Sequence, residues 1–331
     1  MRLDTILFYA LTISSAFLAT YLLTPRVAKK MFAIGRTGVD IHKISKPVIP
    51  EMCGISVMAG TIVSVLLAML MFPGRMAEFT AFLLGSTIAG VIGVADDIKP
   101  LSPRLKPALT ALAAIPILAL GTYSSHPQLP FIGSARLTLV YPILILFAIA
   151  VPSNAVNMMD VFNGAMPATC SVISLAMAVC LVLSGRLEEA VLPIALLGSL
   201  LAFYAYNRYP AKVFAGDTGS LFTGAAIGSI AVLGRIEVAA IVAMMPHIMN
   251  AFYGLFSVGR LYEHREVKFR PTTLREDGTL EAMSYKSAPV TLTRLILAQG
   301  PLNEKNIVDM MILLTALSSA LAILTQMLIL W

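Results

Sequence analysis

Apolar runs of about 20 residues recur along the whole chain, and they constrain its fold more than any other feature. A helix of about 20 apolar residues crosses the roughly 30 Å of hydrocarbon in a bilayer. Only 13% of the 331 residues are charged and 58% are hydrophobic, which a polar-surfaced soluble domain does not show. We therefore expect one all-α polytopic membrane domain over residues 1–331. The runs predict ten transmembrane helices, near residues 4–24, 52–73, 77–95, 106–121, 137–156, 165–184, 187–206, 218–233, 236–256 and 307–330.

The distribution of Lys and Arg predicts the orientation of these helices. Short loops rich in Lys and Arg remain in the cytoplasm. With the N-terminus outside, all but five of the 24 Lys and Arg lie in inner loops. Ten spans then place both termini outside the plasma membrane. The long inner loops, near residues 25–51 and 257–305, direct the search for chemistry to the cytoplasmic face.

Several protein classes are disfavoured by the remaining composition. The net charge of +6 is explained by the inner loops, so it gives no support for nucleic-acid binding. The three cysteines, Cys53, Cys170 and Cys180, lie in apolar sequence and are expected to be small core residues. The chain has no P-loop, no GxSxG elbow, no zinc signature and no kinase motif. The first span is expected to be a retained helix, since no cleavage site precedes Pro25.

Asp96 and Asp97 follow an apolar helix and precede a proline-bounded turn. Adjacent carboxylates at a membrane boundary are costly unless a cation or water relieves their repulsion. Lys106 opens the next helix, so its ammonium group can return to the same interface and meet a phosphate. A solvated helix end is the alternative interpretation of the two acids.

Polar side chains repeat at every third position in NAVNMMDVFNG, the segment that ends at Gly164. This spacing is predicted to align Asn154, Asn157, Asp160 and Asn163 near one face of a helix that is about to end. Oxygen ligands of this kind suit Mg²⁺ far better than Zn²⁺. The alternative is a hydrogen-bonded polar seam between helices.

Asp217 lies in VFAGDTGSLFTG, where a polar loop meets the next membrane helix. Glycines allow close backbone approach, and a helix N-terminus favours phosphate. The Asp217 carboxylate could hold a metal that bridges to that phosphate. A simple N-cap is the alternative role for this side chain.

The long loop at residues 257–305 carries His264, Arg265 and Arg270, which offer one imidazole and two guanidinium groups. Such groups fit the diphosphate of a soluble nucleotide sugar, with ordinary surface charge as the alternative. Further along the loop, TLREDGTLEA predicts a short β-hairpin with Asp277 and Gly278 at its turn.

Five segments, taken in order, resemble the polyprenyl-phosphate N-acetylhexosamine-1-phosphate transferase family over nearly the whole chain. The last two segments before the final helix, LEAMSYK and GPLNEKNIV, are similar to those of archaeal and eukaryotic enzymes that transfer GlcNAc-1-phosphate to dolichyl phosphate. The five segments that carry the family resemblance are IPEMCG, GVADDIK with Lys106, NAVNMMDVFNG, VFAGDTGS and EHREVKFRP.

This resemblance implies roles for particular residues. It implies that Asp217 and Asn157 bind Mg²⁺, for which Mn²⁺ could substitute, and that Lys106 contacts phosphate. It matches Asp96 and Asp97 to the paired acids of the family, whose task we leave open.

For the nucleotide sugar, the resemblance implies that Asn163 and Gly164 hold the uridine. His264 and Arg265 would grip the diphosphate and sugar, together with Arg270 of the same loop. Glu51 matches a polar position at the mouth of the site.

Two residues depart from the dolichol-enzyme pattern. Glu263 stands where a basic residue is expected before the His-Arg pair, which puts the sugar and diphosphate contacts of that loop in question. Asp160 matches the bacterial form, where the eukaryotic form has a small residue. The sequence therefore resembles an archaeal intermediate.

The resemblance implies transfer of GlcNAc-1-phosphate from UDP-GlcNAc to a polyprenyl or dolichyl phosphate, with release of UMP. It also implies a homodimer in contact with membrane lipid. The alternatives are a transporter of nucleotide sugars or lipid-linked sugars, and the same reaction with another N-acetylhexosamine. A transporter needs polar groups near the midplane and access from both sides, whereas the acids and asparagines are predicted on one face of the membrane.

Overall fold

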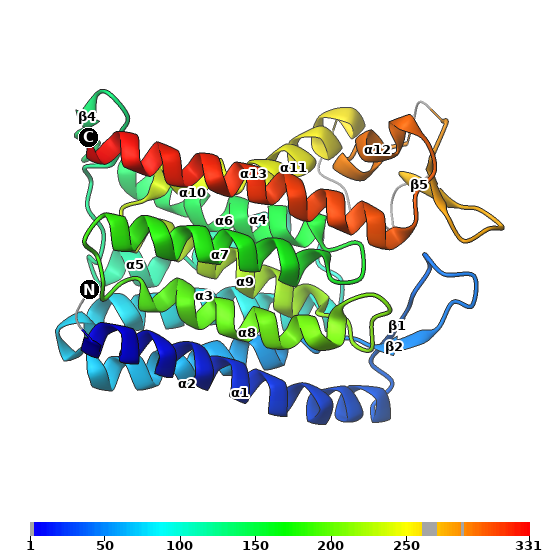
Figure 1. The fold of residues 1–331 in the computed structure, drawn as a ribbon, viewed down its shortest axis with the longest axis horizontal. Coiled ribbons are helices and arrows are strands. Elements are labelled where there is room, and N and C mark those ends of the chain that lie inside the picture. The colour runs from blue at the N-terminus through cyan, green and yellow to red at the C-terminus, as the bar shows by residue number, and fades with distance from the viewer. Residues whose placement is uncertain (1–2, 260–269, 286–287) are drawn as a thin grey trace.

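The computed structural model describes residues 3–259, 270–285 and 288–331, and its long helices run side by side along one axis (Figure 1). The helices longer than ten residues are α1 (Leu3–Ala33), α2 (Ile55–Met71), α3 (Met76–Ile98), α6 (Tyr141–Met159), α7 (Ala165–Leu183), α8 (Val191–Asn207), α9 (Gly216–Leu233), α11 (Met245–Val258) and α13 (Glu304–Leu330). The short ones are α4 (Leu105–Leu112), α5 (Ile115–Ala119), α10 (Glu237–Ala243), α12 (Leu292–Ile296) and the 3₁₀ turns Pro73–Arg75 and Leu297–Gln299.

Several of these helices are apolar enough and long enough to cross a membrane. Within the described part of the chain, five meet that condition, namely α1, α3 with the turn before it, α6, α7 and α13. The number rises to six if α10 and α11, which meet at a bend of 67°, form one broken span. The expected all-helical membrane architecture is therefore confirmed in outline, and the count of ten spans stays a prediction.

Helices occupy all ten predicted ranges, but two of those ranges contain a break. The range 106–121 holds α4 and α5, and the range 236–256 holds α10 and α11. A proline stands in the first turn of α5 and of α11, at Pro116 and Pro246. Proline has no N–H to continue the ladder of a preceding helix, so both helices start afresh there.

The strands form three separate antiparallel hairpins. They are β1 (Thr37–Val39) with β2 (Val48–Pro50), β3 (Gln128–Leu129) with β4 (Gly133–Ser134), and β5 (Thr272–Leu274) with β6 (Leu280–Ala282). The third is the hairpin expected in the last long loop, with Thr273 opposite Glu281. Its turn is closed by Asp277, whose Oδ1 accepts hydrogen bonds from the Thr279 amide at 2.9 Å and hydroxyl at 2.6 Å.

Helix α9 forms the centre of the bundle, since every residue from 218 to 233 is buried. Glycines allow it to approach its neighbours closely. A Cβ on Gly228 would lie 2.1 Å from the Ala148 oxygen of α6, and one on Gly224 would lie 2.4 Å from the Pro152 oxygen. Small residues permit such contact between helices in a membrane, where association depends on close packing. The N-terminus of α9, which carries Asp217, is thereby surrounded by other helices of the bundle.

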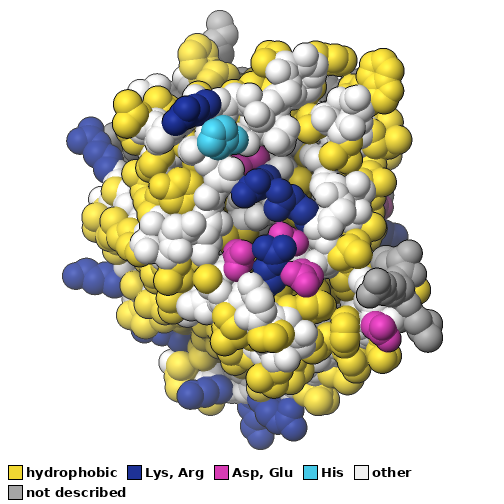
Figure 2. Space-filling view, turned by 90° about the vertical axis from the view of Figure 1, so that its left-hand side faces the viewer, with side chains coloured by type: hydrophobic (Ala, Val, Ile, Leu, Met, Phe, Trp, Pro, Cys, Tyr) yellow, Lys and Arg dark blue, Asp and Glu magenta, His cyan; other side chains and the backbone are white. Residues whose placement is uncertain are grey.

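The two ends of the molecule differ in character. Both termini lie at one end, whereas β1, β2 and β5 lie at the other (Figure 1). Figure 2 views the end with the termini, where basic and acidic side chains meet in the middle of the face, among hydrophobic and other side chains. In the loops at this end of the helices, Arg75 contacts Glu188 at 2.7 Å, Glu78 at 3.2 Å and Glu189 at 3.4 Å, which ties the turn before α3 to the turn before α8.

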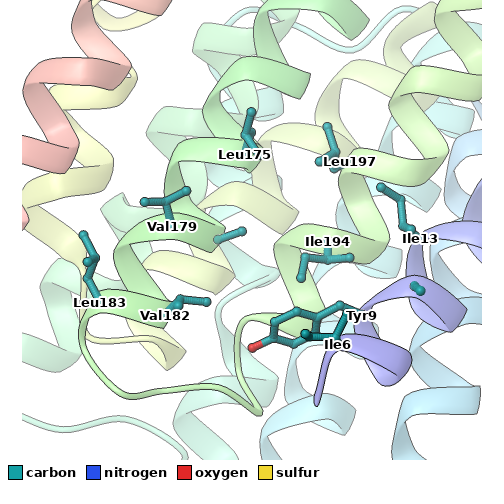
Figure 3. Close-up of a pocket in the computed structure, with 11 residues that line it drawn as sticks. Ile6, Tyr9, Ile13, Leu175, Val179, Val182, Leu183, Ile194 and Leu197 are labelled. Carbon is teal, nitrogen blue, oxygen red and sulfur yellow. The ribbon is translucent and has the colours of Figure 1, made fainter. Parts of the chain in front are cut away.

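A cavity of about 500 Å³ opens between α1, α7 and α8 (Figure 3). Side chains such as Ile6, Val179 and Ile194 point into it, and its lining contains no charged residue. The hydroxyl of Tyr9 donates to the Leu187 carbonyl at 2.8 Å. A lining of this kind offers nothing to bind phosphate.

Candidate active site

Asp97 caps the N-terminus of α9 from the neighbouring helix α3. Its two carboxylate oxygens accept hydrogen bonds from the Asp217 amide at 2.8 Å and from the Thr218 amide at 3.0 Å, as well as from the Thr218 hydroxyl at 2.6 Å. The first amides of a helix lack partners within the helix, and a carboxylate there also interacts well with the helix dipole. Asp97 therefore fixes the place where α9 begins.

Close backbone packing completes this junction. Gly216 adopts a positive φ of 69°, and a Cβ on it would lie 2.8 Å from Asp97 Oδ2. A Cβ on Gly93 would lie 2.4 Å from the Asp217 carbonyl oxygen. A Cβ on Gly54 would lie 2.3 Å from the Gly219 Cα. The glycines of GVADD, IPEMCG and GDTGS thus bring three chain segments together.

Asp217 lies in the first turn of α9, and its carboxylate gathers side chains from two other helices. Lys106 of α4 donates from Nζ to Asp217 Oδ2 at 2.9 Å, and Asn157 of α6 donates from Nδ2 to Oδ1 at 2.6 Å. Lys106 also pairs with Asp96 at 2.5 Å, and Asn157 donates to the Ser220 hydroxyl at 2.9 Å. Four of the predicted site residues are therefore in direct contact.

Further acids surround this contact set. Burial, together with the smaller effect of the neighbouring charges of Asp217, Glu51 and Asp97, raises the pKa of Asp160 to about 7. Several acids therefore lie close to Asp217, whereas Lys106 is the cation that the described residues place in contact with it. A group of carboxylates that is buried in this way calls for additional positive charge.

The donor set fits a hard divalent cation. Asp217 and Asp96 supply carboxylate oxygens, and the Asn157 amide lies against the carboxylate of Asp217. Oxygen ligands with few nitrogens and no thiolate suit Mg²⁺. Since the oxygen and nitrogen of an amide are assigned from their hydrogen bonds, a cation beside Asp217 would be met by the Asn157 oxygen after rotation of the amide.

The predicted ladder of Asn and Asp side chains does not form one cluster. Helix α6 ends at Met159, so Asp160 is its C-cap and Asn163 lies in the following turn. Asn154 donates to the Thr110 hydroxyl at 2.9 Å, whereas Asn157 reaches Asp217. The expectation of one aligned face is wrong, because the helix ends before the third of the four residues can continue it.

Asn163 belongs to a second cluster, where its side chain is occupied by protein groups. Its Oδ1 accepts from the Ala211 amide at 2.6 Å and from Lys43 Nζ at 3.1 Å, and its Nδ2 donates to Asp40 at 3.1 Å. Its backbone amide donates to Glu304 Oε1 at 2.8 Å. The predicted contact between Asn163 and a uridine would therefore have to use the one remaining amide hydrogen, or the shape of the turn.

Gly164 adopts a positive φ of 84° directly after Asn163. Its amide donates to Asn207 Oδ1 at 3.1 Å, and a Cβ would lie 2.8 Å from the Tyr204 ring. A side chain at this position would be disfavoured by both the backbone conformation and the available space. The glycine is thus required by the turn between α6 and α7.

Of the residues predicted to grip the diphosphate, Arg270 alone is described, while His264 and Arg265 lie outside the described residues, as does Glu263. Arg270 is exposed and lines a hollow of about 270 Å³ with His42 and Thr272. Burial lowers the pKa of His42 to about 4 against the opposing effect of Asp40, with smaller contributions in the same direction as burial from the charges of Arg270 and Lys43. The His42 ring is therefore neutral at pH 7.

Sequence reasoning missed several polar residues that hold the site together, among them Asp40, Lys43, Asn207 and Glu304. Asn250 is another: it donates to the Met158 carbonyl at 3.1 Å and accepts from the Leu292 amide at 2.9 Å, so it joins the end of α6 to α12. Each lies in a segment that the family resemblance did not assign to binding. What distinguishes them is burial next to polar neighbours, and the sequence carries no signal of burial.

The segment with most of these contacts also matches a known family. The model of glycosyl transferase family 4 matches residues 79–235, which include Asp97, Lys106, Asn157 and Asp217. A protein of Methanocaldococcus jannaschii that is named as a candidate glycosyltransferase is 30% identical over 89% of this chain and 89% of its own length. The chain belongs to glycosyl transferase family 4. The resemblance inferred from the five segments is thereby confirmed.

Two further relatives show the range of family 4. A Dictyostelium discoideum protein, named UDP-N-acetylglucosamine–dolichyl-phosphate N-acetylglucosaminephosphotransferase, is 27% identical over 92% of this chain and 85% of its own length. A phospho-N-acetylmuramoyl-pentapeptide-transferase of Bacillus subtilis is 30% identical over 69% of this chain and 75% of its own length. Members that are similar to this chain thus bear names with different sugars.

Proposed function

We propose that this family 4 protein transfers GlcNAc-1-phosphate from UDP-GlcNAc to a polyprenyl or dolichyl phosphate. The products are UMP and GlcNAc-diphospho-lipid, the starting lipid of glycan assembly. The observation that carries this proposal is the contact of Asp217 with Lys106 and Asn157, at the end of apolar helices opposite the termini. The name of the Dictyostelium relative, which aligns over most of both chains, supports GlcNAc and dolichyl phosphate as the substrates.

In the proposed reaction, an oxygen of the lipid phosphate attacks the β-phosphorus of UDP-GlcNAc. The new P–O bond forms as the bond between that phosphorus and the bridging oxygen breaks, and UMP leaves with the electron pair of that bond. No strong base is required, because a phosphate monoester with a second pKa of about 6 is largely ionised at pH 7. Both reactants are anions, so positive charge and alignment are the main requirements.

The residues of the chain would meet these requirements as follows. Lys106 would contact a reacting phosphate with its ammonium group, which Asp96 and Asp217 hold in place at 2.5 and 2.9 Å. Asp217 and Asn157 would hold Mg²⁺, or Mn²⁺ in its place, which when bound supplies positive charge for the diphosphate. Asp97 would keep Asp217 in place through the N-terminus of α9, a positioning role rather than contact with the reacting atoms.

The direct test is transfer of label from UDP-[¹⁴C]GlcNAc to dolichyl phosphate in detergent, followed by extraction into organic solvent. We expect metal-dependent transfer with stoichiometric release of UMP, and none in the presence of a chelator. Failure of every UDP-N-acetylhexosamine as a donor, with metal-independent uptake of nucleotide sugar into liposomes, would instead establish the transporter.

The nature of the sugar has a second candidate. The Bacillus relative is named for a phospho-N-acetylmuramoyl-pentapeptide substrate, so the same chemistry on another N-acetylhexosamine is the alternative. A competition assay with UDP-GlcNAc, UDP-GalNAc and UDP-MurNAc-pentapeptide would decide between them. Label recovered mainly from UDP-GlcNAc would support the proposal, whereas preference for another donor would replace the sugar and keep the reaction.

The orientation in the membrane is part of this proposal. We place the end with Asp217 in the cytoplasm, both termini outside the plasma membrane, and the ten helical ranges as ten spans. The native cysteines, Cys53, Cys170 and Cys180, are all buried, so a single added cysteine can report its side.

We expect Ser134→Cys, on the exposed β4 strand, to react with a membrane-impermeant maleimide in intact cells. Asp277→Cys, in the exposed turn of the β5–β6 hairpin, should react only after permeabilisation. The wild-type protein provides the background. The reverse pattern would invert the orientation, and labelling of both positions in intact cells would rule out the proposed topology.

A further inference from the structure

Glu304, the first residue of α13, reaches across the cytoplasmic end to the turn between α6 and α7. Its Oε1 accepts the backbone amide of Asn163 at 2.8 Å, and its Oε2 accepts from Lys43 Nζ at 3.1 Å. Only 3% of the residue is exposed. We infer that Glu304 is a positioning residue: it holds the turn of Asn163, which the family resemblance assigns to the uridine, in the conformation that binding of UDP-GlcNAc requires.

Lys43 completes this arrangement from the β1–β2 loop. Its ammonium donates to Glu304, Asp40 and Asn163 Oδ1, and it lies 4.7 Å from the centre of the Tyr209 ring. We call Asp40, Lys43, Asn163 and Glu304 the Glu304 clamp. It joins three stretches of chain that are far apart in sequence, and the bonds of Asn163 extend it to the loop at residue 211.

The charged side chains of the clamp pair with one another, with Lys43 between the two acids. One ligand atom each from Asp40, His42 and Glu304 lie within 4.8 Å of one another, which is also the spacing of a metal site. Here the Lys43 ammonium contacts both carboxylates and supplies the positive charge. Two buried acids without such a cation would be strongly disfavoured. The pairing therefore explains how two acids can be buried beside Asn163.

The clamp acts on one side of the active site and not on the other. The amides of Asn163 and Gly164 are each fixed by a separate acceptor, Glu304 and Asn207. Asn157 is held independently, through Asp217 and Ser220. Loss of Glu304 would thus free the Asn163 amide and remove one partner of Lys43, while the Asn207 contact with Gly164 and the contact between Asp217 and Asn157 persist. The expected result is weaker binding of the nucleotide sugar with little change in the use of lipid phosphate, which rests on the proposed function.

The test compares Glu304→Ala with Glu304→Asp, which keeps the charge, and with Glu281→Ala as matched control. Glu281 is an acid on β6 whose side chain is 45% exposed and pairs only weakly with Arg275, at 3.8 Å. We expect Glu304→Ala to raise the KM for UDP-GlcNAc about 10- to 100-fold, the factor for losing one hydrogen bond to a charged group. The KM for lipid phosphate should change less than about twofold, because the contact between Asp217 and Asn157 does not involve Glu304. The KM of Glu304→Asp for UDP-GlcNAc should lie between those of Glu304→Ala and the wild type. Glu281→Ala should match the wild type for both substrates.

Calorimetric binding of UMP, measured on the same variants, separates this inference from the proposed function. A wild type without transfer activity would remove the proposed reaction, and a lower UMP affinity in Glu304→Ala would still support the clamp. Unchanged KM and UMP affinity, or equal rises in KM for both substrates, would overturn it. If Glu304→Ala does not fold, Glu304→Gln serves in its place, because it keeps the size and an acceptor for Asn163 while removing the charge facing Lys43.

Discussion

Replacing Asp217 by asparagine is expected to lower the rate of sugar-phosphate transfer by about 10³-fold or more. The substitution keeps the size of the side chain but removes the charge that holds Lys106 at 2.9 Å and that would hold the metal. Loss of a single preorganised electrostatic contact in an active site typically costs about 10²- to 10³-fold in rate, and a metal ligand at least as much. The measurement is kcat for label transfer from UDP-GlcNAc, with the metal concentration varied.

Asp277→Asn is the matched control for this substitution. Asp277 lies in the exposed turn of the β5–β6 hairpin, where its side chain accepts hydrogen bonds from the amide and hydroxyl of Thr279. Asp277→Asn should transfer label at the wild-type rate. A rate for Asp217→Asn within tenfold of the wild type, at every metal concentration, would contradict the assignment of Asp217 to the centre of the site.

Fold class could be predicted from the sequence because hydropathy is a local property. Each apolar run corresponds to helix, and the hairpin at Asp277 and Gly278 forms where the turn residues predict it. The breaks before Pro116 and Pro246 could not be predicted with equal certainty. Proline occurs inside membrane helices as well as at their starts, as Pro25 and Pro152 show in α1 and α6.

The paired acids show why a motif does not determine its own contacts. Asp96 and Asp97 are neighbours in sequence, but successive residues of a helix point about 100° apart. Asp96 therefore meets Lys106, while Asp97 meets the N-terminus of α9. The alternative role proposed for Asp217 was a cap at the N-terminus of its helix. That helix end is capped by a carboxylate, but the carboxylate belongs to Asp97. The cap comes from another helix, 120 positions earlier in the chain.

Glu304 illustrates the same limit at longer range. The sequence placed it in GPLNEKNIV, a segment used to recognise the family and not to locate the site. Its partners, Asn163 and Lys43, are 141 and 261 positions away. No periodicity or spacing connects residues that are so distant, and only their common burial at one end of the bundle brings them together.

Replacing Gly93 by alanine is expected to reduce transfer about 10²-fold, although no catalytic side chain is changed. The added Cβ would lie 2.4 Å from the Asp217 carbonyl oxygen and 2.6 Å from the Thr218 Cα. Both are backbone atoms, so α3 and the start of α9 would have to move apart. A displacement of about 1 Å at a site that depends on alignment costs on the order of 10² in rate. Gly74→Ala is the matched control, because its Cβ would meet nothing within 4 Å.

For Gly93→Ala we expect a lower kcat and a smaller rise of the rate with metal concentration than in the wild type. The variant should still elute at the wild-type volume on size exclusion. The reason is that Asp97 would lose its hold on the Asp217 and Thr218 amides as the two helices separate. A second substitution to alanine at Thr218 should then add little, since the contact it removes would already be broken. Full activity in Gly93→Ala would show that the close approach of α3 to α9 does not position Asp217 for the reaction.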